Sequence, residues 1–143
     1  MKRNIFWLVV LSTLCAWGLS TAQDSRSSAR DGQTCSNATL RGNYAFRTDG
    51  TVIPAGTRRV VLGRVTFDGN GLLRNVATVN DNGIVSTGVT SVQVYQINAD
   101  CTGTTDNGGG AFIVKADGSE FYFMRTSGNV VNQGVGTRIT EGR

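Results

Sequence analysis

From residue 40 onward, apolar and polar residues alternate along the chain in short runs that are separated by turn-forming residues. In Leu40–Arg47, for example, Tyr44 and Phe46 fall on one face of an extended strand, whereas Arg41 and Asn43 fall on the other. A period of two residues indicates β-strands with one buried face. No stretch after residue 22 shows the 3.6-residue period of an amphipathic helix, so this part of the chain is predicted to be all-β.

The alternating runs predict eight strands with turns about every 8–12 residues. Asp68–Gly71 and Asn80–Gly83 supply residues that tolerate positive φ, which is typical of hairpin turns. Asp49-Gly50 is expected to end the first strand, and Gly88 is expected to mark a bend or bulge in the longest one. The predicted strands are Leu40–Arg47, Arg58–Phe67, Leu72–Val79, Ile84–Ala99, Thr102–Thr105, Ala111–Ala116, Ser119–Thr126 and Val130–Thr140.

Short connections between these strands favour a single antiparallel meander. A sheet of that size gains by closing, because closure removes its exposed edges. We therefore predict a closed or nearly closed small barrel, with a β-sandwich as the alternative. Arg59–Val65 and Phe121–Met124 are apolar on both faces. That pattern fits a filled barrel with a partly apolar outside, and it also fits a protomer that buries its outer wall against a partner.

The first 22 residues of the 143-residue chain are predicted to be a signal peptide. Lys2 and Arg3 precede the mostly apolar Ile5–Leu19, and Ser20–Ala22 provides small residues at a cleavage site. A membrane anchor is the alternative, but the apolar run is shorter than the ~20 residues that a spanning helix needs. The polar residues 23–34 are predicted to form a flexible arm, which leaves residues 35–143 as one β-barrel domain.

After removal of the leader, the chain has only a small net positive charge. Loss of Lys2 and Arg3 lowers the basic count from 14 to 12, against 10 acidic residues. The remaining basic residues are scattered, and only Arg58 and Arg59 are adjacent. This distribution is a poor electrostatic footprint for nucleic acid, so no nucleic-acid partner is expected.

Two of the three cysteines, Cys35 and Cys101, remain after cleavage. An even count in an exported chain predicts a disulfide between them, with two buried free thiols as the alternative. The bond would connect the start of the barrel to the turn that follows Ile84–Ala99.

The residue types needed for common catalytic sites are scarce. Histidine is absent, which removes the usual general base at neutral pH and the commonest metal ligand. Paired cysteines would leave no thiolate nucleophile, and the chain lacks the ligands of a zinc site. Asp117 and Glu120 bracket a glycine turn, in which an aspartate usually serves the turn itself. No catalytic residue, metal site or cofactor is therefore expected.

Aromatic residues are the candidates for ligand binding. Phe121 and Phe123 share one strand face, as do Tyr44 and Phe46, and these four side chains would line an apolar cavity if the barrel has one. Ordinary core packing is the alternative interpretation. Three arginines lie in otherwise apolar strands and are expected to point outward: Arg47, Arg64 and Arg125.

Three stretches, Cys35–Phe46, Gly63–Gly71 and Ile97–Thr104, resemble a widespread group of small exported proteins of Gram-negative bacteria that are mostly hypothetical proteins. The resemblance covers most of the chain after the leader. It implies a bacterial source but carries no site residues. The predicted signal peptide leads us to expect a periplasmic or secreted location, with no membrane span after signal cleavage. The overall pattern also resembles calycin-like and allene-oxide-cyclase-like barrels, a likeness of fold that transfers no function.

Three functions are compatible with these features. The first is a non-enzymatic exported barrel that binds a small apolar or amphipathic ligand, or another exported protein. The second is a structural or interaction protein with a solid barrel that assembles through its outer wall, which would make an oligomer. The third is an isomerase or cyclase that acts through the shape of its cavity and needs no histidine.

Overall fold

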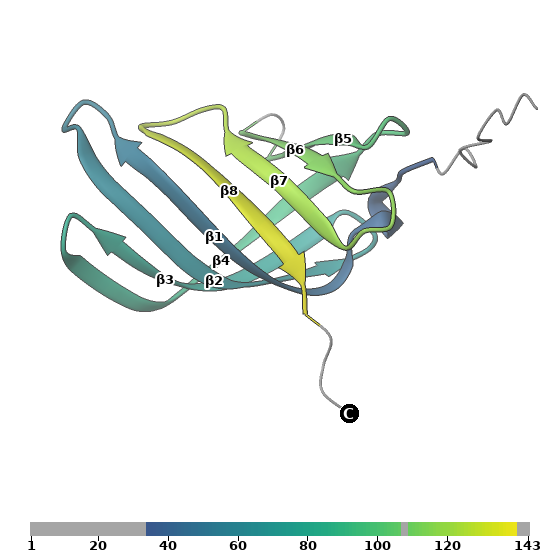
Figure 1. Cartoon of the computed structure of the whole chain (residues 1–143), viewed down its shortest axis with the longest axis horizontal. Coiled ribbons are helices and arrows are strands. Elements are labelled where there is room, and N and C mark those ends of the chain that lie inside the picture. Colours follow the sequence, from purple (N-terminus) through teal and green to yellow (C-terminus); the bar gives the residue numbers. More distant parts are fainter. Residues whose placement is uncertain (1–33, 107–108, 140–143) are drawn as a thin grey trace, which may run out of the picture. The chain divides into compact units, whose positions relative to one another are not determined.

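The computed structural model describes residues 34–106 and 109–139, which form one closed antiparallel barrel (Figure 1). Each strand pairs with the next along the chain, and the last pairs with the first. The predicted all-β class and closed meander are confirmed, and the sandwich alternative is wrong. The predicted signal peptide and nearly all of the predicted arm lie outside the described residues. The elements are η1 (Asn37–Thr39, a 3-10 turn), β1 (Arg41–Val52), β2 (Thr57–Asp68), β3 (Leu72–Asp81), β4 (Ile84–Ile97), β5 (Thr102–Thr105), β6 (Gly110–Val114), β7 (Glu120–Arg125) and β8 (Val130–Arg138).

Local side-chain chemistry explains the predicted turns. The Asp68 carboxylate accepts hydrogen bonds from the backbone N–H groups of Asn70, Gly71 and Leu72, at 2.7, 3.0 and 2.9 Å. These bonds lower the pKa of Asp68 and fix the β2–β3 hairpin. The predicted irregularity at Gly88 is also confirmed, because its φ is +68° and the register of β4 against β3 shifts there.

The prediction that Asp49-Gly50 ends the first strand is wrong. β1 continues to Val52 because it pairs with β2 on one side and β8 on the other, so turn-forming residues are held in an extended strand. Gly50 is suited to this position, since a Cβ there would lie 2.3 Å from the Val131 carbonyl oxygen. All other strand ends differ from the predicted ones by at most two residues.

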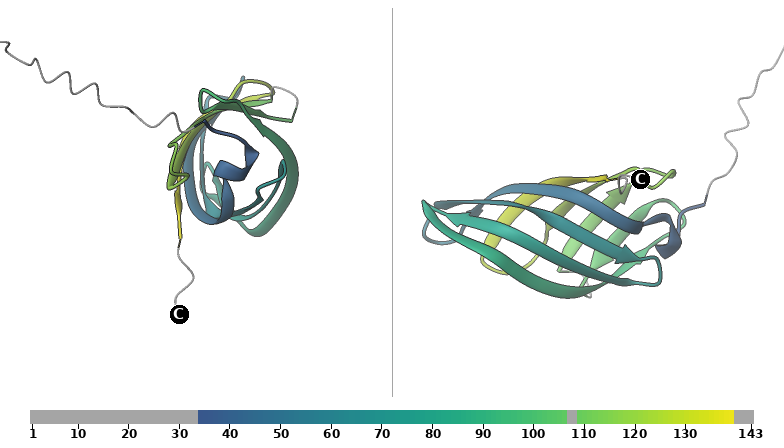
Figure 2. Two further views of the ribbon diagram at one scale, coloured as in Figure 1. Left: turned by 90° about the vertical axis from the view of Figure 1, so that its right-hand side faces the viewer. Right: turned by 90° about the horizontal axis from the view of Figure 1, so that it is seen from below.

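The disulfide and η1 close one end of the barrel. Cys35 and Cys101 are bonded, with their Cα atoms 5.0 Å apart, and this bond joins the chain before η1 to the β4–β5 turn. The Asn37 side-chain oxygen accepts from the Ile97 N–H at 2.7 Å. The Tyr95 hydroxyl lies 3.0 Å from both the Asn37 and the Leu40 carbonyl oxygens. Figure 2 shows, in its left view, how η1 lies within the ring of strands at this end.

Tyr44 completes the closed end from the opposite wall. Its hydroxyl donates to the Gly118 carbonyl oxygen at 2.6 Å and accepts from the Arg138 Nη2 at 2.9 Å. Arg138 also donates to the Thr39 carbonyl oxygen at 3.3 Å. These bonds connect β1, the β6–β7 turn, β8 and η1, so buried polar groups at this end have partners.

Removal of the disulfide should weaken the whole barrel. We expect the double variant Cys35→Ala/Cys101→Ala to lose about 4 kcal/mol of unfolding free energy, because the two cysteines are 66 positions apart in the sequence and the unfolded chain gains the entropy of that loop. Urea denaturation measures the change. A reducing agent should bring the native protein to the same stability and leave the variant unchanged, and equal stability of both oxidised proteins would contradict the expectation.

Tyr95 should make stability depend on alkaline pH. Burial raises the pKa of Tyr95 to about 12, so the folded state binds the phenolic proton more tightly than the unfolded state, in which the pKa is 10.0. The contribution is fully present below pH 10 and is lost as the pH rises toward 12. Urea denaturation across this range should show a falling unfolding free energy in the native protein and a shallower fall in Tyr95→Phe. The same slope in both proteins would show that Tyr95 is not responsible.

Candidate ligand-binding cavity

Aromatic side chains fill the barrel next to its closed end. Phe67 is 2% exposed, and its ring lies edge-to-face with those of Tyr44, Tyr95 and Phe121, at centroid distances of 5.3, 5.1 and 5.3 Å. Phe112 joins the cluster at 5.5 Å from Phe121. Each such pair contributes about 0.5–1.5 kcal/mol beyond its burial of apolar area. The cluster forms a packed floor across the interior of the barrel.

Two glycines of β8 make room for this floor. Phe121 pairs with Gly136 and Phe123 with Gly134 across β7 and β8. A Cβ at Gly136 would lie 2.2 Å from the Phe121 ring, and one at Gly134 would lie 2.7 Å from the Phe123 ring. Each ring therefore occupies the space that a β8 side chain would otherwise take.

A cavity of about 240 Å³ lies between this floor and the end of the barrel away from η1. The aromatic cluster bounds it on the side of η1, and its walls are inward-facing side chains of β1 to β4, β5, β7 and β8. The walls are mostly apolar or neutral. The wall residues include Phe46, Val61, Val65, Asn75, Ala77, Val79, Val89, Ser91, Gln93 and Thr105.

Two polar atoms on one wall of this cavity have no hydrogen-bond partner among the described residues. They are the hydroxyl oxygen of Thr48, a residue only 4% exposed, and the amide oxygen of Asn132. Their strands, β1 and β8, are paired in this region, where Thr48 faces Gly134 and Gly50 faces Asn132. A buried polar atom without a partner costs about 1–3 kcal/mol. Such atoms are therefore candidates to bond a ligand that enters the cavity.

The charged residues that line the cavity are Asp106 and Arg125, both of which are exposed. Arg125 was expected to point outward, and that expectation is wrong. It pairs with Gly110 on the inward face of β7, two residues after Phe123, and its Nε donates to the Ser127 carbonyl oxygen at 3.2 Å. Arg47 and Arg64 alternate with buried residues and face outward, as predicted. The register of β7 thus places one cation at the rim of the cavity.

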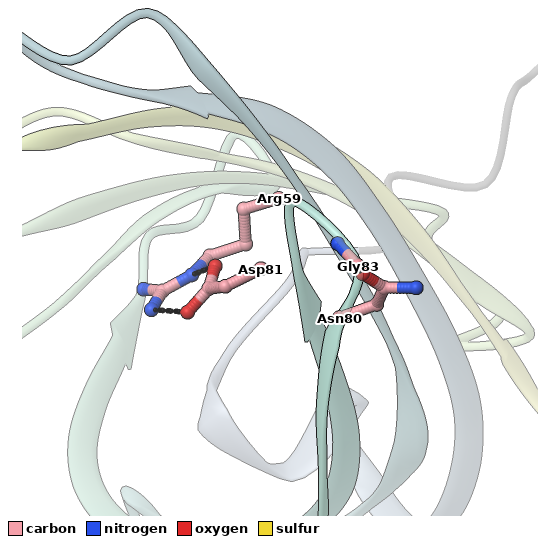
Figure 3. A network of polar contacts seen from close by, with 4 residues as sticks. All are labelled: Arg59, Asn80, Asp81 and Gly83. Carbon is pink, nitrogen blue, oxygen red and sulfur yellow. Dashed lines mark hydrogen bonds and ion pairs between the residues drawn. The ribbon is translucent and has the colours of Figure 1, made fainter.

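An ion pair lies beyond the cavity on the same inner face. Arg59 donates through Nε and Nη2 to the two carboxylate oxygens of Asp81, and this holds the pKa of Asp81 below its usual value (Figure 3). In the adjoining turn, the Asn80 side-chain oxygen accepts from the Gly83 N–H at 2.8 Å. Sequence reasoning missed the inward placement of Arg59, although this residue has the same parity as Val61 and so shares its face.

The four aromatic candidates separate into two groups. Phe46, Phe121 and Phe123 line the cavity. Tyr44 faces inward but does not line it, because its ring lies below the cavity against Phe67 and Phe121 and its hydroxyl is bonded at the closed end. The polar wall residues were not found from sequence, since Thr and Asn in alternating strands resemble ordinary surface residues.

A second depression, of about 770 Å³, lies on the outer wall across β6, β7, β8, β1 and β2. Three of its apolar residues face outward and are substantially exposed: Ile113 is 63% exposed, and Tyr122 and Met124 are each 50% exposed. Arg47, Asp49 and Arg58 also line it. The outer wall therefore combines apolar and charged groups in one hollow.

Apart from Asp106 and Arg125 at its rim, the cavity offers the chemistry of amides, hydroxyls and aromatic rings. Among residues 34–106 and 109–139, no three His, Cys, Asp or Glu side chains are grouped so that they could hold a metal ion. No helix within those ranges is long and apolar enough to cross a bilayer. The chain matches no protein-family model and no curated protein.

The unpartnered hydroxyl of Thr48 gives a direct stability test. Thr48→Val keeps the shape of the side chain and removes the buried polar atom, so the unfolding free energy should rise by about 1 kcal/mol. Urea denaturation of the purified barrel measures this. Thr66→Val is the control, because the exposed Thr66 hydroxyl donates to Asn43 and its loss should not stabilise the protein. Destabilisation by Thr48→Val would mean that the hydroxyl has a partner in solution.

Proposed function

We propose that the chain is an exported, non-enzymatic barrel that binds a small amphipathic molecule in its cavity. The observation that carries the proposal is a pair of polar atoms, on Thr48 and Asn132, that lie in the wall of an otherwise largely apolar cavity and have no hydrogen-bond partner in the part of the chain that the structure describes. An apolar ligand body would pack on Phe46 and the aromatic floor. A hydroxyl or N–H group of the ligand would donate to the Asn132 amide oxygen.

The dimensions and charge of the cavity narrow the ligand class. Ligand cavities commonly measure about 300–1,000 Å³, so a volume of about 240 Å³ suits a molecule of one or two rings. The deeper wall carries no formal charge, whereas Asp106 and Arg125 lie at the rim. A neutral ligand would enter completely, and a charged end would remain beside these rim residues.

Export is the second part of this proposal. The predicted signal peptide of residues 1–22 supports it, and so does the bond between Cys35 and Cys101, because disulfides persist mainly in oxidising compartments. A periplasmic or secreted barrel would meet its ligand outside the cytoplasm.

Assembly through the outer wall is the second candidate function. Large apolar side chains on this wall are exposed, with Leu62 at 65%, Ile113 at 63% and Val131 at 54%. Exposed apolar surface of this kind is typical of protein interfaces when it is contiguous. This role concerns the outside of the barrel and does not require an occupied cavity.

A dye-binding experiment tests the cavity. 1-Naphthylamine is an uncharged two-ring probe with N–H donors, and its emission shifts to shorter wavelength in apolar surroundings. Both tryptophans of the chain, Trp7 and Trp17, precede residue 23, so the mature barrel adds no indole background. Ala77→Leu places a larger side chain on the cavity wall and should weaken dye binding at least about tenfold, while stability stays equal or rises by about 1 kcal/mol.

Val76→Leu is the matched control, because the neighbouring Val76 is 46% exposed on the outer wall. This variant should bind the dye as the native protein does. Equal binding by native protein, Ala77→Leu and Val76→Leu would place the dye outside the cavity and would overturn the proposal. Mass spectrometry of the native protein from its own host would then show whether any small molecule is retained.

A further inference from the structure

Among residues 34–106 and 109–139, most of strand β4 pairs with a strand on one side only. β4 spans 14 residues and pairs with β3 along its length, but only Tyr95–Ile97 pairs with β5. Just before these residues, the Val94 carbonyl oxygen accepts from the Asp106 N–H at 3.0 Å. Within the described residues, no backbone partner is found on this side for Ile84–Gln93. Figure 1 shows the β3–β4 hairpin extending well past the short β5–β6 hairpin.

The free edge of β4 carries no charge and is partly apolar. Ile84–Gln93 reads IVSTGVTSVQ and contains no charged residue and no proline. Its apolar side chains are exposed on both faces, with Ile84 at 74%, Val85 at 57%, Val89 at 41% and Val92 at 54%. Proteins usually protect such edges with lysine, proline or inward-pointing charges. Of the protective features, this edge has only the bulge at Gly88.

We propose that two copies of this chain pair along Ile84–Gln93, edge to edge and antiparallel, to form a dimer with one sheet that continues from barrel to barrel. A second copy is the partner that the absence of charge favours, because identical neutral edges meet without repulsion and with equal length. Pairing about a two-fold axis also closes after two copies, so neither β4 edge stays exposed. The backbone groups of both edges would then be satisfied.

The bulge at Gly88 fixes the register of this pairing. Before the bulge, the inward residues of β4 are Ile84 and Ser86, and after it they include Ser91 and Gln93, as their pairing with inward residues of β3 shows. A two-fold axis just after Gly88 places Ile84 opposite Gln93, and Ser86 opposite Ser91, of the partner subunit. Inward side chains then meet inward ones on both sides of the bulge, as antiparallel pairing requires, and at the axis Val89 lies opposite Gly88 of the partner subunit.

The same contact would complete a wall of the cavity. Val89, Ser91 and Gln93 line the cavity, and they are also the residues beside the unpaired edge. In the proposed register, Ile84 of the partner subunit lies next to Gln93 and extends the wall beyond the free edge. The dimer does not depend on a bound ligand, so its test is independent of the dye experiment.

Charge placement at Thr87 and Thr90 tests the register. The axis puts Thr87 opposite Thr90 of the partner subunit, and both residues are exposed in the isolated barrel. T87K/T90K sets lysine against lysine at two symmetric places and should raise the dissociation constant about tenfold. T87K/T90E sets lysine against glutamate at the same places and should stay within about threefold of the native value. Sedimentation equilibrium of the mature barrel measures all three proteins.

A native dimer that is weakened by T87K/T90K and kept by T87K/T90E supports the proposal. A native protein that remains monomeric at about 1 mM overturns the proposal that two copies pair. This holds even if a strand of another protein binds the β4 edge. Equal dimerisation of all three proteins would place the interface elsewhere, for example on the outer wall. Loss of the dimer in both variants would contradict the register, and circular dichroism confirms that each variant is folded.

Discussion

Edge-to-face packing around Phe67 is the interaction on which the rest of this barrel depends. Its ring contacts those of Tyr44, Tyr95 and Phe121, and η1 covers the cluster from the end where the disulfide lies. Most of the large buried side chains are therefore gathered in one half of the interior. The other half is lined mainly by smaller residues such as Ala77, which do not fill it. The cavity is a consequence of this uneven distribution.

Unequal strand lengths add a second asymmetry. β1 to β4 have 10 to 14 residues each, whereas β5 and β6 have four and five. The wall of the barrel is therefore shorter on the β5–β6 side, and within the described part of the chain Ile84–Gln93 of β4 pairs with no strand on that side. A hollow interior and a free strand edge thus arise next to each other. The first is the basis for ligand binding and the second for pairing of two copies, and either can hold without the other.

Much of the fold could be predicted because its determinants are local. Hairpin residues such as Asp68–Gly71 define turns, and alternation identifies which side chains face inward. Alternation does not give the height of a residue along the barrel axis, which depends on the stagger between strands. Tyr44 and Phe46 therefore share a face, yet only Phe46 lines the cavity. Asp49-Gly50 shows a second limit of prediction from sequence, because pairing with β2 and β8 holds this turn-like dipeptide in a strand.

The claim that one half of the barrel is hollow can be measured directly with xenon, which enters apolar cavities. Methyl NMR spectra of the mature protein under xenon pressure should show chemical-shift changes for inward methyl groups in the half of the barrel away from η1, such as those of Ala77 and Val79. The methyl groups of the outward Val76 and Val92 should change little. Shifts confined to outward methyl groups, or no shift for Ala77 and Val79, would contradict the account.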